Sequence, residues 1–140
     1  MTRKMGLDVG IKRIGIALSD PMGWTAQGHS VLNRKNLQDD LQEIARLCLL
    51  MEVDEIVVGM PRNMNGTYGT KAEEIEEFAG NLAEVIDLPI VFWDERLTTR
   101  AAERTLLEAN VSRKKRREVI DKIAAVNILQ GYLNRQNSGK

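Results

Sequence analysis

The sequence has few of the side chains on which many active sites depend. Its 140 residues include one cysteine, Cys48, and one histidine, His29. An internal disulfide is therefore impossible, and a His-Cys zinc site or a Ser-His-Asp triad has almost no residues from which to be built. Cys48 follows Leu41 and Ile44 at helical spacing, so we expect it to be a buried apolar residue. Any catalysis must then depend on carboxylates.

Long apolar runs are also absent. The longest, residues 47–51, is far shorter than the ~20 residues that a membrane-spanning helix needs. The N-terminus passes directly into a strand pattern, without the apolar core of a secretory signal. We therefore expect a cytoplasmic protein that has no contact with a membrane and folds as a single domain over residues 1–140.

The charges cancel overall but are unevenly distributed. Residues 1–94 contain 9 basic and 15 acidic side chains, whereas residues 95–140 contain 11 and 5. This pattern predicts that a nucleic acid would bind the C-terminal third. The densest basic run is Arg113, Lys114, Lys115, Arg116 and Arg117. Cations near the start of a helix oppose its dipole, so phosphate binding explains this run better than helix stability does, with a solvated surface as the alternative.

Hydrophobic periodicity predicts alternating strands and helices. Strands are expected at residues 4–9, 14–19, 24–32, 55–59 and 89–93. Helices are expected at residues 37–51, 70–86 and 117–134, with a further helix capped by Thr98 or Thr99. A tight turn at residues 10–13 makes the first two strands a hairpin, and strands separated by helices favour parallel pairing. The predicted fold is α/β, with a mixed five-stranded sheet in which three antiparallel strands precede parallel ones, flanked by helices.

Three acidic residues interrupt apolar segments in different elements. Asp8 lies in the first strand, Glu95 follows the last one, and Asp121 shares a helix face with two alanines. Asp94 and Glu95 should point to opposite sides of their strand, and Glu95 has the longer reach. If the three acids meet at one edge of the sheet, their oxygens could hold divalent cations.

Each acid also has a structural explanation. Asp8 could accept hydrogen bonds from the turn amides of residues 10–13, and the acids at the end of the last strand could pair with Arg96. Asp121 could form a salt bridge with Arg117 or Lys122. The glycines around the first turn, at positions 10 and 15, would let a phosphate or another part of the backbone approach closely.

Four stretches carry a family resemblance: residues 7–20, 59–67, 93–99 and 120–125. In these the chain resembles the RuvX/YqgF family of Holliday junction resolvases or pre-ribosomal-RNA nucleases, within the RNase H-like superfamily. The resemblance implies an RNase H-like fold in which Asp8, Glu95 and Asp121 are catalytic and bind Mg²⁺ or Mn²⁺. Related RuvC resolvases carry an acid on the fourth strand, which is absent here, so Glu95 would replace it. Only Glu118 could supply a fourth carboxylate near Asp121.

The resulting hypothesis is metal-assisted hydrolysis of phosphodiester bonds in precursor ribosomal RNA or branched DNA. The expected nucleic-acid contacts are Lys12, Arg13, Asn63, Asn65, Arg96 and the basic run from Arg113 to Arg117. Paired cuts in a junction would require a homodimer. One rival is an ATPase of the actin or sugar-kinase type, but such enzymes bind nucleotide between two copies of this fold. The other rival is a non-catalytic module that binds RNA, the ribosome or the transcription machinery.

Overall fold

The computed structural model describes residues 2–61, 70–95 and 112–138, without the side chains of residues 70, 95 and 114. The first strands and helix are β1 (Arg3–Val9), β2 (Arg13–Ser19), β3 (Ala26–Asn33) and α1 (Leu37–Leu50). They are followed by β4 (Val53–Pro61), α2 (Thr70–Val85), β5 (Ile90–Glu95) and α4 (Arg113–Ser138). The expected helix after Thr98 or Thr99 lies outside the described residues.

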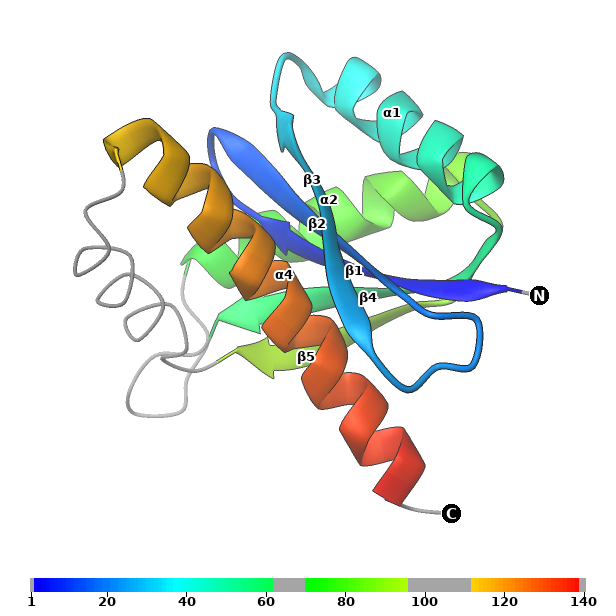
Figure 1. The fold of residues 1–140 in the computed structure, drawn as a ribbon. Helices are drawn as coiled ribbons and strands as arrows, with labels where there is room; N and C mark the ends of the chain where they lie inside the picture. Colours follow the sequence, from blue (N-terminus) through cyan, green and yellow to red (C-terminus); the bar gives the residue numbers. More distant parts are fainter. Residues whose placement is uncertain (1, 62–69, 96–111, 139–140) are drawn as a thin grey trace.

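The strands form one five-stranded sheet in the order β3-β2-β1-β4-β5. β1 pairs antiparallel with β2, and β2 with β3, whereas the β1–β4 and β4–β5 pairs are parallel. Helices α1 and α2 lie on one face of this sheet and α4 crosses the other (Figure 1). The predicted mixed sheet flanked by helices is confirmed.

The sheet separates two hydrophobic cores. In β4, Ile56 and Val58 face the larger core with α1 and α2, whereas Val57 faces the smaller core under α4. Burial on both faces accounts for the near-continuous apolar run of this strand. Cys48 packs in the larger core as expected, and its burial raises the pKa of the thiol to about 11. Of the helices described, none combines the length and apolar character needed to cross a bilayer.

The last helix is longer than its predicted range of residues 117–134. It begins at Arg113 and ends at Ser138. The carbonyl of Ser112 accepts a hydrogen bond of 2.8 Å from the amide of Arg116, so Ser112 is the residue before the first turn. Serine at this position is a common helix start. The basic run therefore forms the first turn of α4 instead of preceding the helix.

Glycines let α4 approach the sheet closely. A Cβ atom on Gly6 in β1 would lie 2.7 Å from the Cβ of Leu129, and one on Gly15 in β2 would overlap the carbonyl oxygen of Asp121. Real Cβ atoms are not found at such separations. The helix therefore lies close against the sheet, and at Gly15 the space is filled by protein backbone.

Replacing Gly15 by alanine tests this packing. We expect Gly15→Ala to lower the free energy of unfolding by about 3 kcal/mol, because α4 must move to admit the methyl group. The control is Gly80→Ala, since a Cβ there would meet nothing within 4 Å. Alanine in a helix is favoured over glycine, so this control should gain about 0.5–1 kcal/mol. Urea denaturation followed by circular dichroism measures both, and equal stability of the two variants would contradict the close approach.

Candidate active site

Two of the three predicted acids lie side by side. Asp8 pairs with Gly15 in the β1–β2 register, and Gly15 is the residue against which the backbone of Asp121 rests. Both acids belong to the α4 side of the sheet, near the end of β1. Segments separated by more than one hundred residues in the sequence thus bring two carboxylates to one place.

The environment of Asp8 disfavours its charged form. Burial is the main cause that raises its pKa, from an ordinary value of 3.8 to about 6, and the negative charge of Asp121 adds to the rise. The positive charge of Lys71 acts in the opposite direction. Nothing in the sequence pattern pointed to Lys71, which lies in the first turn of α2.

The hairpin turn does not give Asp8 the hydrogen bonds from amides of residues 10–13 that would have explained it structurally. The amide of Gly10 donates to the carbonyl oxygen of Arg13 at 2.9 Å and closes the hairpin. Among the residues that the structure describes, no amide of this turn donates to the Asp8 carboxylate. Asp8 is therefore a mostly buried acid whose charge the hairpin does not compensate.

Asp121 forms an ion pair, with a partner that the sequence did not predict. The Nε of Arg13 donates to its Oδ2 at 2.6 Å, and the two side chains are 24% and 19% exposed. The expected partners were Arg117 or Lys122, and Arg13 was expected to contact nucleic acid. Arg13 lies two positions before Gly15 in β2, so strand alternation places it on the α4 face and could have indicated this contact.

Glu95 is the last residue of β5. Val91 and Trp93 of this strand pack in the core under α4, and Glu95 has the same parity, so its position belongs to the face that carries Asp8. Asp94 has the opposite parity. The Glu95 side chain is outside the described part, and within that part no three His, Cys, Asp or Glu residues are grouped to hold a metal ion.

The predicted nucleic-acid contacts are partly described. Lys12, Arg113, Lys115 and Arg117 are exposed, and Arg116 is half-buried. Asn63, Asn65, Arg96 and the Lys114 side chain lie outside the described residues. Glu118, the candidate fourth acid, is half-buried one turn before Asp121 in α4. Exposed cations thus start the same helix that positions Asp121.

Comparison with solved structures supports the fold. The fowlpox virus resolvase in complex with Holliday junction DNA superposes with a TM-score of 0.59 at 11% identity, covering 96% of this chain and 99% of that one. The RuvC of T. thermophilus in complex with a Holliday junction substrate gives a TM-score of 0.58 at 11% identity, covering 96% of each chain. At this identity the likeness establishes the RuvC-like, RNase H-like architecture alone.

Comparison of sequences is more specific. A relative from Syntrophomonas wolfei named "Putative pre-16S rRNA nuclease" is 61% identical over 138 residues, covering 99% of this chain and 98% of the relative. A relative of the same name from Moorella thermoacetica is 57% identical over 133 residues and 95% of each chain. The model of the RuvX family, described as Holliday junction resolvase, matches residues 2–135. The chain therefore belongs to the RuvX family.

Proposed function

We propose that this protein is a metal-dependent nuclease that hydrolyses phosphodiester bonds in structured nucleic acid. The observation that carries the proposal is the adjacent pair of carboxylates, Asp8 and Asp121, at an edge of an RNase H-like sheet. Precursor 16S ribosomal RNA is the first candidate substrate, because relatives at 61% and 57% identity carry that name. The family description makes a Holliday junction the second candidate, and paired cuts there would need a homodimer.

The acid pair has the chemistry that suits a divalent cation. Hard cations such as Mg²⁺ or Mn²⁺ prefer carboxylate oxygens, and a cation would offset both the burial of Asp8 and the repulsion between Asp8 and Asp121. Glu95, whose position has the parity of this face, would supply a third ligand. A bound ion would stabilise the charge that develops on the attacking and leaving oxygens of the phosphodiester.

The protein's own residues have distinct parts in this proposal. Arg13 donates to Oδ2 of Asp121, which orients the carboxylate, and Asp121 would hold the cation together with Asp8. The exposed side chains of Lys12, Arg113, Lys115 and Arg117 would hold the nucleic-acid backbone, since phosphate contacts position a strand without reading its sequence. Lys114, Asn63, Asn65 and Arg96 stay predicted contacts of the same kind.

Cleavage assays test the proposal directly. With Mg²⁺, the wild-type protein should cut a precursor 16S RNA fragment or a four-way DNA junction, and side-by-side assays decide between them. Asp8→Asn should lower the rate at least about 100-fold, because a ligand to the cation is lost. Arg135→Ala, at the far end of α4, is the control and should cut normally. Cutting by Asp8→Asn at the wild-type rate would contradict the mechanism. Tight, salt-sensitive RNA binding without cutting would favour the non-catalytic module.

The raised pKa of Asp8 predicts a pH-dependent stability. Between pH 3.8 and about 6 the folded protein binds more protons at Asp8 than the unfolded chain does, so stability should fall as the pH rises through this window. Asp8→Asn removes the cost and should be about 1–3 kcal/mol more stable than wild type at pH 7.5 in EDTA. Urea denaturation at several pH values measures the difference, which should vanish below pH 4. A constant difference at all pH values would contradict this assignment.

Metal binding can be detected without any substrate. Because a ligand that binds only the folded state stabilises it, Mg²⁺ at about 100 times its Kd should stabilise the wild-type protein by about 2.7 kcal/mol. Asp8→Asn should lose most of this gain, whereas Arg135→Ala should keep it. Thermal unfolding at pH 7.5 with Mg²⁺, Mn²⁺ or EDTA provides the measurement. An equal metal effect on wild type and Asp8→Asn would place the cation elsewhere.

A further inference from the structure

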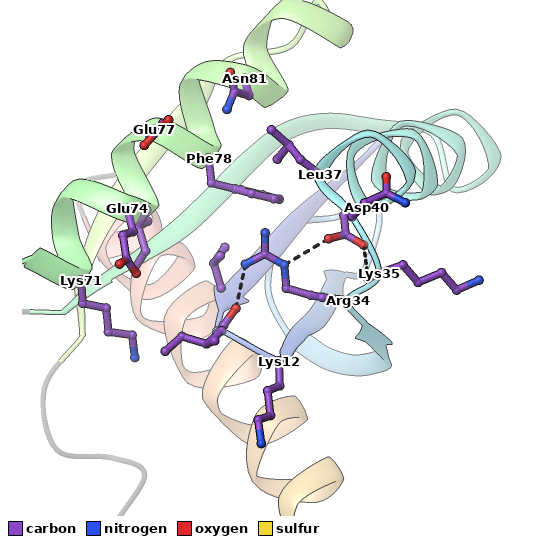
Figure 2. Close-up of a pocket in the computed structure, with 15 residues that line it drawn as sticks. Lys12, Arg34, Lys35, Leu37, Asp40, Lys71, Glu74, Glu77, Phe78 and Asn81 are labelled. Carbon is purple, nitrogen blue, oxygen red and sulfur yellow. Dashed lines mark hydrogen bonds and ion pairs between the residues drawn. The ribbon is translucent and has the colours of Figure 1, made fainter.

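A pocket opens at the same edge of the sheet as Asp8 but on the opposite face. It has a volume of about 660 Å³ and lies between the β1–β2 turn, the start of α1 and the first turns of α2 (Figure 2). Its volume lies within the range of small-ligand sites, which is about 300–1,000 Å³. Val9 lines it, and strand alternation points Val9 away from the face that Asp8 occupies.

The centre of the pocket is a fixed guanidinium group. Arg34 lies over the ring of Phe78, at 5.2 Å from its centroid. Its Nε donates to Asp40 at 3.1 Å and another of its nitrogens donates to the carbonyl of Gly10 at 2.9 Å. Asp40 is almost fully buried, so its ion pair neutralises Arg34 and holds it in place. A guanidinium plane held in this way is a surface on which a nucleic-acid base can stack.

Three lysines that line the pocket have no such partner. Among the described residues, Lys12, Lys35 and Lys71 form no ion pair. Lys71 lies beside Glu74 at one side of the pocket, and Glu77 and Asn81 of α2 lie across from Lys71 (Figure 2). The side chains of Lys12 and Lys35 extend away from Arg34. Lys71 suits a phosphate, and the hydrogen-bonding groups across the pocket suit the polar edge of a base or a sugar hydroxyl.

Apolar residues complete the rim. Ile11 in the hairpin turn is 80% exposed and Leu37 at the start of α1 is 42% exposed, and both line the pocket. Large exposed apolar side chains at a concave surface are suited to contact with the flat face of a base. Aromatic or sugar surface from a ligand would cover them.

Lys71 connects the pocket with the carboxylates. It lines the pocket, and its positive charge also acts on Asp8 across the end of β1. A strand of nucleic acid that crosses this edge would therefore place one phosphodiester near Asp8 and the adjoining nucleotide near Lys71.

We propose that this pocket is a nucleotide subsite, which holds one unpaired nucleotide of the substrate strand next to the phosphodiester bound at Asp8 and Asp121. Its phosphate contacts Lys71 and its base lies against Arg34. The inference rests on the proposed nuclease function and extends it to a preference for substrates with a single-stranded segment beside the cut. The rival ligand with the same chemistry is a free mononucleotide.

Equilibrium binding to labelled RNA hairpins tests the subsite. All proteins carry Asp8→Asn to prevent cutting, and fluorescence anisotropy compares a blunt hairpin, one with a three-nucleotide extension and one with an abasic extension. The pocket variants are Lys71→Ala and Leu37→Glu, the latter compatible with folding because an acid near a helix start is favourable. The matched controls are Arg135→Ala and Leu49→Glu, since Leu49 is 82% exposed on α1 outside the pocket.

We expect the extension to raise affinity about tenfold in the parent and both controls, as base stacking and phosphate contacts allow. The gain should disappear in both pocket variants and with the abasic extension, while binding of the blunt hairpin changes by less than about twofold. Circular dichroism confirms that each variant is folded. A gain that is absent in the parent, or that survives in both pocket variants, overturns the inference.

Two further experiments distinguish the subsite from a free-nucleotide site and from the nuclease proposal itself. Adenosine monophosphate that saturates the parent without displacing the extended hairpin would overturn the subsite in favour of a free-nucleotide site. Cleavage by the protein with Asp8 intact is measured separately. If the extension effect is found but nothing is cut, the subsite stands and the nuclease proposal fails, whereas cutting without an extension effect defeats the subsite alone.

Discussion

The contact between α4 and the sheet is the constraint on which the rest of the site depends. Gly6 and Gly15 have no side chain on this face, so the helix backbone lies directly on β1 and β2. Because Gly15 pairs with Asp8, the same contact decides where Asp121 is placed. A side chain at position 15 would separate the two carboxylates as well as loosen the packing. Stability and site geometry thus both depend on the lack of a side chain at these glycines.

The site has an electrostatic cost that folding alone does not offset. Asp8 is mostly buried beside a second carboxylate, and its pKa of about 6 reflects that environment. Arg13 and Lys71 reduce the negative charge without removing it, Arg13 by pairing with Asp121 and Lys71 by acting on Asp8 at a distance. A cluster with residual negative charge at the end of a strand is the arrangement that a divalent cation would stabilise.

The end of β1 contributes residues to sites on both faces of the sheet. On the α4 face it presents Asp8, and on the other face Val9 and the hairpin turn line the pocket in which Arg34 is fixed. Strand alternation explains this division, since adjacent residues point to opposite sides. A single strand end can therefore bring a reacting phosphodiester and a neighbouring nucleotide within reach of each other.

Sequence alone predicted the strands and the described helices, and it singled out Asp8 and Asp121 as candidates, because acids that interrupt apolar segments are costly unless they have a role. It did not determine that Arg13 pairs with Asp121, or that Arg34 and Asp40 form the centre of a pocket. Strand alternation assigns Arg13 to the α4 face, but no sequence pattern names the partner that it meets there. Only the tertiary structure decided these contacts, because close packing across the sheet selects partners by distance in space.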